Sequence, residues 1–304
     1  MTTSSATPSA DDVLDALDLP ADVDVRLVVS DMDGTLLDAD GEVPDAFWEL
    51  LPVLRERGIV FSPASGRQYA TLRRTFAHLG DHPDGDLAGM VFIAENGGYV
   101  VRDGEEISST PLSVDLAREV VQHVRDAVTE RDDLDLGVVW CGPEKAYVER
   151  TDRAFLDHVD PYYASLAEVD DLLGLDVAPV KLAVFTPGDP HATTAPVLAP
   201  YAEQHGGPLK VVVSGGHWVD VQPTTTDKGV AVRRLQETLG VSAAQTVAFG
   251  DNFNDVEMLD AATLSFAMEG AHDDVAARAA HRAPSHRDHG VVTVLRALLE
   301  RSQP

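Results

Sequence analysis

Four short apolar segments that each end in polar or small residues are the feature that most constrains the fold of this chain. They cover residues 25–31, 58–65, 89–96 and 245–252, and helix-like stretches such as residues 45–57 lie between them. Continuous apolar runs of this length indicate strands buried on both faces, as in a parallel sheet covered by helices. The sequence therefore predicts an α/β fold with a Rossmann-like parallel sheet.

The pattern changes in the middle of the chain. Residues 113–130 have the apolar spacing of a helix, a second helix is expected over residues 193–204, and the remaining strands read as hairpin-like pairs. Helices mixed with paired strands are typical of an α+β unit rather than of a parallel sheet.

The change in pattern predicts the domain boundaries. We expect residues 111–222 to form an inserted α+β domain, and residues 23–110 and 223–304 to form the α/β core together. Residues 1–22 begin rich in Ser, Thr, Ala and Pro, which predicts a mobile N-terminal tail.

Composition excludes several classes of partner. The chain has 23 Lys and Arg against 51 Asp and Glu, a net charge of -28 that would repel nucleic acid and anionic membranes. The single cysteine, Cys141, has no intramolecular disulfide partner, which fits a reducing compartment. The N-terminus lacks the basic and apolar regions of a signal peptide. We expect a cytoplasmic protein with no nucleic-acid or membrane partner.

Polar residues gather where the predicted strands end, and a helix start adds a lysine. Ligands of open α/β sheets bind beyond the carboxyl ends of the strands, so these side chains are expected to converge on one site. The residues are Asp31, Asp33, Ser65, Gly66, Arg67, Asp251, Asn254 and Asp255, with Lys228 at the predicted helix start.

These residue types suit phosphoryl transfer. The carboxylates of Asp31 and Asp33 can both reach one reacting centre, because Gly34 permits a tight turn there. Together with Asp251 they suggest a Mg²⁺ site. A carboxylate beside Mg²⁺ can attack phosphorus and form an aspartyl-phosphate. A hydroxyl from Ser65, the backbone N–H of Gly66 and the charge of Lys228 suit the transferring group. Each motif alone also fits an ordinary turn or a solvated helix start, and only their joint occurrence favours the functional interpretation.

The motifs together resemble those of the haloacid dehalogenase superfamily of phosphotransferases. They are DMDGT at 31–35, SGR at 65–67, DKG at 227–229 and GDNFND at 250–255. The resemblance implies a phosphatase or phosphomutase with Asp31 as nucleophile and Asp33 as general acid/base.

The same resemblance implies the ligand contacts. Mg²⁺ would be held by Asp31, the backbone carbonyl of Asp33 and Asp251. Phosphate would be held by a second set of residues, with Asp255 contacting the ligating groups rather than the metal. That phosphate-binding set is Ser65, Gly66, Lys228 and Asn254.

A narrower resemblance concerns the Cof-type subgroup, whose members carry a C2B-type α+β cap. The insertion at 111–222 is similar to that cap, which sets substrate specificity. The segments around residues 64–69, 94–98, 141–147 and 266–271 are similar to members that hydrolyse sugar phosphates, flavin mononucleotide or a phosphorylated ribityl-pyrimidine of riboflavin synthesis. The expected substrate is therefore a small phosphorylated metabolite of this kind. Residues 285–290 depart from the Asn-rich loop common in related sequences.

Two other functions compete with a phosphatase. A phosphomutase would return the phosphoryl group from Asp31 to a second acceptor, and a non-catalytic module would only bind a phosphorylated ligand. The second alternative predicts lost catalytic residues, whereas this sequence keeps Asp31 and Asp33.

Several side chains outside the motifs have a possible role and an ordinary one. Three histidines near the C-terminus could bind a metal but more often form a solvated loop; they are His281, His286 and His289. Five aromatic residues of the insertion could stack on a ring-bearing substrate but more often pack in a core; they are Trp140, Tyr147, Tyr162, Tyr163 and Trp218. Three cations of the insertion are candidate contacts for a polar leaving group; they are Lys145, Arg150 and Lys181.

Overall fold

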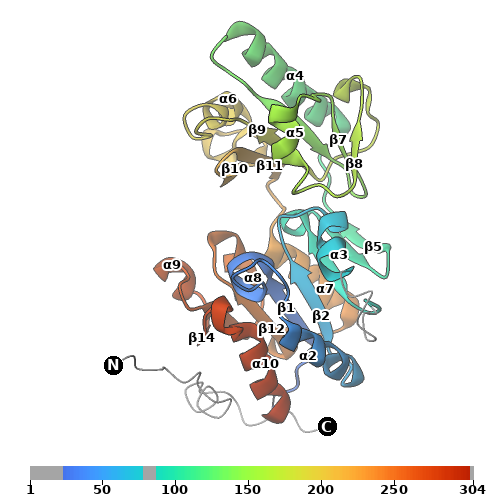
Figure 1. Cartoon of the computed structure of the whole chain (residues 1–304), viewed down its shortest axis with the longest axis vertical. Helices are drawn as coiled ribbons and strands as arrows, with labels where there is room; N and C mark the ends of the chain where they lie inside the picture. Colours follow the sequence, from blue (N-terminus) through green and yellow to red (C-terminus); the bar gives the residue numbers. More distant parts are fainter. Residues whose placement is uncertain (1–22, 78–86, 302–304) are drawn as a thin grey trace.

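The computed structural model describes residues 23–77 and 87–301, which form two sheets with helices packed on them (Figure 1). The N-terminal tail predicted for residues 1–22 lies outside the described residues. Within the described part of the chain, no helix is long and apolar enough to cross a lipid bilayer.

The larger sheet has eight strands in the order β14-β13-β12-β1-β2-β3-β4-β5. Pairing is parallel from β14 to β3 and antiparallel from β3 to β5, so β1 lies between β12 and β2 inside the parallel part. The predicted α/β fold with a parallel sheet is confirmed. The strands are β1 (Leu27–Asp31), β2 (Val60–Ala64), β3 (Val91–Ala94), β4 (Tyr99–Arg102), β5 (Glu105–Ser109), β12 (Thr246–Gly250), β13 (Leu264–Met268) and β14 (His281–Ala283).

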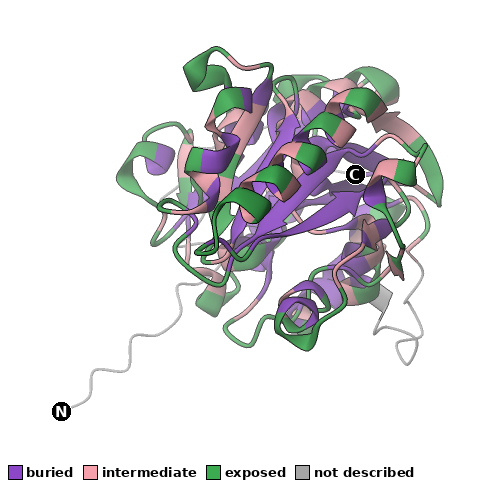
Figure 2. Ribbon diagram, turned by 90° about the horizontal axis from the view of Figure 1, so that it is seen from above, coloured by how far each residue is buried: buried purple, intermediate pink, exposed green. Residues whose placement is uncertain are grey.

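Helices cover both faces of this sheet, which explains why its strands read as continuous apolar runs. Successive residues of β1 point to opposite faces, so Val28 packs with Phe47 of α2 while Leu27 packs with Leu235 of α7. Figure 2, seen from the top of Figure 1, shows the same kind of layering in the part of the molecule nearest the viewer, with buried strands beneath helices whose outer sides are exposed. One face is covered by α2 (Asp45–Glu56), α3 (Tyr69–Ala77) and α10 (Gly290–Arg301), and the other by α7 (Lys228–Leu239) and α8 (Val256–Asp260), with α9 (Asp273–Ala276) beside β13.

The smaller sheet has six strands in the order β10-β11-β9-β6-β7-β8 and lies above the larger one in Figure 1. Its helices are α4 (Val114–Glu130) and α6 (Thr194–Leu198) on one face and α5 (Arg153–Val159) on the other. Its strands are β6 (Gly137–Cys141), β7 (Ala146–Val148), β8 (Leu166–Glu168), β9 (Lys181–Phe185), β10 (Leu209–Gly215) and β11 (Trp218–Pro223).

The helix expected over residues 193–204 is shorter than the prediction. The α-helix α6 ends at Leu198, and a 3-10 turn follows over Ala199–Tyr201. Pro200 has no N–H to donate, and its ring would clash with the carbonyl of Pro196 if the α-helix continued. The helix expected near these residues is therefore present, but its α-helical part covers only Thr194–Leu198.

A reciprocal hydrogen-bond pattern joins the two sheet units. The Thr71 hydroxyl donates to the Tyr162 carbonyl at 2.7 Å and accepts from the Ala164 N–H at 3.0 Å. The Gln68 side chain donates to the Ser165 carbonyl at 2.8 Å and accepts from the Ser165 N–H at 2.9 Å. The loop before β8 is thus held against the start of α3.

The start of α7 packs tightly on α8, and Gly229 makes this possible. A Cβ at Gly229 would lie 2.1 Å from the Glu257 carbonyl oxygen. We expect Gly229→Ala to destabilise the protein by about 1–3 kcal/mol, because backbone must shift to relieve the overlap. Gly174→Ala, where a Cβ meets nothing within 4 Å, is the matched control. Urea unfolding of both variants checks this, and equal midpoints would contradict it.

Candidate active site

The site begins at the tip of β1, where the strand gives way to the irregular turn Met32–Leu36. Asp31 is the last residue of the strand and is largely buried. Gly34 in the turn has φ +79°, and a Cβ there would lie 2.5 Å from Oδ2 of Asp251. A glycine is therefore required both for the left-handed backbone and for the close approach of the Asp251 carboxylate.

Lys228 occupies the centre of the site with no exposed surface. It is the first residue of α7, whose start is capped by Asp227 through a 2.7 Å bond from the Val230 N–H. Its ammonium donates to Oδ1 of Asp31 and, at 2.7 Å, to Oδ1 of Asp255. A buried ammonium needs such partners, because burial without them is costly.

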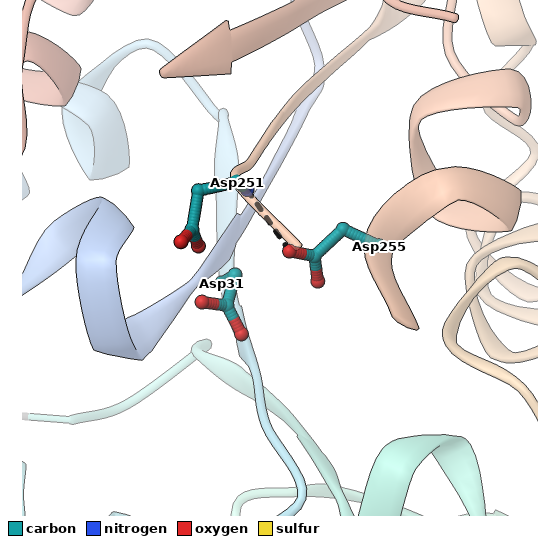
Figure 3. Close-up of side chains that lie close together, drawn as sticks. All are labelled: Asp31, Asp251 and Asp255. Carbon is teal, nitrogen blue, oxygen red and sulfur yellow. Dashed lines mark hydrogen bonds between the residues drawn. The ribbon is translucent and has the colours of Figure 1, made fainter. Parts of the chain in front are cut away.

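Three carboxylates converge on this lysine and on each other. Oxygens of Asp31, Asp251 and Asp255 lie within 4.8 Å of one another, at the ends of β1 and β12 and at the loop before α8 (Figure 3). Oδ2 of Asp255 accepts the backbone N–H groups of Asp251 and Asn252, each at 3.0 Å, and Figure 3 draws the first of these bonds. Asp255 therefore fixes the loop that carries Asp251.

The electrostatics show that one ammonium does not neutralise the cluster. Burial and the neighbouring Asp255 raise the pKa of Asp31 well above its usual range, although Lys228 opposes them. Burial also raises the pKa of Asp251. Burial alone would lower the pKa of Lys228, but Asp255 and Asp31 together raise it, so the lysine is charged. Three carboxylates share this one ammonium, so the cluster carries surplus negative charge when all three are ionised.

The donor set fits a divalent cation. Oδ1 of Asp31 accepts from Lys228 and Oδ1 of Asp251 accepts from the Thr35 hydroxyl at 2.9 Å, so each keeps its Oδ2 free of protein donors among the described residues. Asp255 uses both of its oxygens within the protein. Mg²⁺ in proteins is commonly bound by one or two carboxylates, while water and phosphate oxygens complete its octahedral coordination. The two free Oδ2 atoms fit this pattern.

The residues predicted to hold phosphate lie at the tip of β2 and opposite it. Ser65 is buried, and its hydroxyl accepts the Arg67 N–H at 3.2 Å. The Asn254 side chain lies across the site and donates to Asn96 at 3.2 Å. Gly66 lies against the Asn96 side chain, 3.1 Å from where a Cβ would stand. The structure thus brings Ser65, Gly66 and Asn254 together around Asn96, whereas Lys228 lies deeper among the carboxylates.

Asp33 is placed differently from the other acidic residues. Its carboxylate is about two-thirds exposed and outside the cluster of Asp31, Asp251 and Asp255. It accepts two bonds from Arg67, at 2.5 and 3.2 Å, in the fork geometry that fixes a carboxylate in one orientation. The predicted role of its backbone carbonyl as a metal ligand stays a prediction.

Two residues at the site were not singled out from the sequence. Glu95 and Asn96 follow β3 and both have positive φ, +51° and +55°. The Asn96 N–H donates to the Ser65 carbonyl at 2.9 Å, and the Glu95 N–H donates to the Arg67 carbonyl at 3.1 Å. The available signal was an Asn-Gly pair directly after an apolar strand, a position where strained backbone is common at functional sites.

The structure also places the aromatic, cationic and histidine side chains for which the sequence allowed both a functional and an ordinary role. Trp140, Tyr163 and Trp218 are buried, whereas Tyr162 is half exposed. Arg150 pairs with Asp135 and Asp152, Lys145 is exposed, and Lys181 is buried beside Glu95. Among residues 23–77 and 87–301 the three aspartates form the only group of three or more potential metal ligands, so the histidines do not form one.

Known proteins resemble this chain over most of its length. The family model described as haloacid dehalogenase-like hydrolase matches residues 28–295. The chain is 30% identical over 282 residues to the 5-amino-6-(5-phospho-D-ribitylamino)uracil phosphatase YbjI of Escherichia coli, covering 92% of this chain and 98% of that protein. It is 31% identical to the HMP-PP phosphatase of Serratia proteamaculans, covering 77% and 80%. A solved structure from Eubacterium rectale superposes with a TM-score of 0.78 at 26% identity, covering 90% and 99%.

The double role of Asp255 gives a stability prediction. Asp255→Asn removes one of the two carboxylates that pair with the buried Lys228 and places an amide against two N–H donors. We expect a loss of about 3 kcal/mol in the free energy of unfolding, as when a buried ion pair loses one partner. Asp251→Asn is the matched control, because its carboxylate does not contact Lys228 and its neutralisation reduces repulsion. Equal losses in urea unfolding would contradict the role given to Asp255.

Proposed function

The chain belongs to the haloacid dehalogenase-like hydrolases and is a phosphoric monoester hydrolase, and we propose that it works through Asp31 as nucleophile with the help of Mg²⁺. The observation that carries this proposal is the cluster at the tip of β1, where Lys228 holds the Asp31 carboxylate beside Asp251. The bond to Lys228 fixes the orientation of the Asp31 carboxylate at the tip of β1.

The proposed chemistry has two steps. In the first, an oxygen of Asp31 attacks phosphorus in line, the ester P–O bond breaks, and Asp33 gives its proton to the leaving oxygen. In the second, Asp33 takes a proton from water, and that water attacks the phosphorus of the aspartyl-phosphate. Inorganic phosphate leaves and the Asp31 carboxylate is restored. The two bonds from Arg67 hold the Asp33 carboxylate in one orientation.

The proposed metal ligands are Asp31, Asp251 and the Asp33 backbone carbonyl. When bound, Mg²⁺ would neutralise charge on the phosphoryl oxygens and offset the surplus charge of the cluster. The chain's own groups for the phosphoryl oxygens are the Ser65 hydroxyl, the Gly66 N–H and the Lys228 ammonium, with Asn254 close by. These contacts are proposals that rest on the positions of the residues around Asn96 and Asp31.

The substrate is a small phosphorylated metabolite, and we propose one whose leaving group is a sugar, a ribityl-pyrimidine or flavin. The similarity to the ribitylaminouracil phosphatase of Escherichia coli supports the ribityl-pyrimidine class. Phosphate release from a panel that contains this compound, sugar phosphates and flavin mononucleotide would rank the classes. Transfer of the phosphoryl group to a second sugar, without release, would indicate a phosphomutase instead.

Asp31→Asn tests the nucleophile. We expect kcat to fall by about 10⁴-fold or more, because an amide cannot form the covalent intermediate. The fold should persist, since Lys228 keeps its bond to Asp255. Phosphate release and circular dichroism on the same sample separate the two effects. A folded variant with near-normal activity would show that Asp31 is not the nucleophile.

Removal of divalent cations tests the metal. We expect EDTA to abolish phosphate release and Mg²⁺ to restore it, because the two free carboxylate oxygens need a counter-charge before an anionic substrate can approach. Dialysis against EDTA followed by titration with Mg²⁺, with Na⁺ at equal ionic strength as control, checks this. Full activity in EDTA would overturn the role of the metal.

A further inference from the structure

A second buried charge cluster lies between the two sheet units, and the chemistry proposed above does not use it. Lys181, the first residue of β9, is 4% exposed, and its ammonium lies 2.6 Å from Glu95 and 3.5 Å from Asp220. Glu95 follows β3 of the larger sheet, whereas Lys181 and Asp220 belong to the smaller one. The cluster therefore links the two units through a buried ion pair.

The same ammonium also contacts the loop proposed to hold phosphate. Lys181 donates to the Gly66 carbonyl oxygen at 3.2 Å. Among the described residues, this is the one hydrogen bond from a side chain of the smaller sheet to the 65–67 loop. A charged donor on a backbone carbonyl gives one of the stronger hydrogen bonds in proteins.

Glu95 holds this loop from the other side. Its N–H donates to the Arg67 carbonyl at 3.1 Å, and the Asn96 N–H donates to the Ser65 carbonyl at 2.9 Å. The Glu95 carbonyl in turn accepts the Gln222 side chain at 2.8 Å, from the end of β11. Lys181 and Gln222 thus act on both sides of a short, strained turn whose residues have left-handed backbone.

We propose that Lys181 is a positioning residue for the phosphate-binding loop. Through the Gly66 carbonyl and Glu95 it fixes the backbone of residues 65–67, so that the N–H of Gly66 and the Ser65 hydroxyl are held ready for the phosphoryl oxygens. The loop is complete only when the smaller sheet is seated on the larger one. This inference rests on the proposed function of Ser65 and Gly66.

The geometry distinguishes Lys181 from a cation that binds the substrate. Its ammonium forms ion pairs with Glu95 and Asp220 and donates to the Gly66 carbonyl, and almost none of its surface is exposed. Despite the burial, which disfavours the charge, the two carboxylates raise the pKa of Lys181, so it remains protonated. Lys181 therefore contacts the 65–67 loop and is not available for the leaving-group contact that the sequence suggested.

The test uses Lys181→Met combined with Glu95→Gln, which removes the ammonium without leaving its closest carboxylate unpaired. We expect the inhibition constant for inorganic phosphate to rise about 10- to 100-fold, the factor that loss of a hydrogen bond to a charged group carries. Inorganic phosphate has no leaving group, so its inhibition constant reports on the phosphate-binding groups and not on contacts with a leaving group. A merely structural role would lower the melting temperature or alter KM for the ester without changing this constant in folded protein.

A second variant covers the case in which the first does not fold. Lys181→Gln with Glu95→Gln keeps two amides that can bond each other, but the shorter side chain withdraws its donor from the Gly66 oxygen. The same rise in the inhibition constant is expected. Lys210→Met, on β10 and without a contact to the loop, is the control and should match the native protein.

These outcomes distinguish a failure of the proposed role of Lys181 from a failure of the proposed function. A native protein that releases phosphate, together with folded double variants whose phosphate inhibition is unchanged, overturns the role of Lys181 and leaves the proposed function intact. A native protein that releases no phosphate from any ester overturns the proposed function first. A raised inhibition constant in either double variant, with the Lys210 control unchanged, supports the positioning role.

Discussion

The buried ammonium of Lys228 is the interaction on which the arrangement of the site depends. It has no exposed surface, and its partners Asp31 and Asp255 come from segments 197 and 27 residues away. A charge in this position is tolerated only when its partners are in place, so the tip of β1, the start of α7 and the loop after β12 must meet at one point. The fold and the site are therefore specified by the same contact.

Close backbone packing makes that meeting possible. Gly34 lets the Asp251 carboxylate lie against the turn after β1, and Gly229 lets the first turn of α7 lie on Glu257 of α8. Asp255 completes the arrangement by holding the Asp251 and Asn252 N–H groups. These contacts bring three carboxylates together beside one ammonium. Such a concentration of acidic groups suits a site that binds a cation together with an anionic ligand.

Buried polar contacts join the smaller sheet to the larger one. Gln68 and Thr71 exchange hydrogen bonds with the loop before β8, and Lys181 meets Glu95 and Gly66 near the site. Buried polar contacts are strong only in the correct geometry, so they favour one relative placement of the two units over others. The placement of the smaller unit and the backbone of the 65–67 loop are thereby coupled.

The sequence by itself determined the α/β class, because strands buried on both faces must be apolar throughout, and it located the polar strand ends and the helix that begins at Lys228. The resemblance of the motifs to a known family was confirmed by the family match over residues 28–295. The end of α6 at Leu198 is a local effect, because Pro200 lies two residues further along the chain. Local pattern was insufficient where a distant residue decides the outcome, as for Asp33, which pairs with Arg67 and does not join the acidic cluster. Only the tertiary structure placed Lys181 against Glu95 and Gly66, because no spacing along the chain shows that residues 86 and 115 positions away share one buried charge.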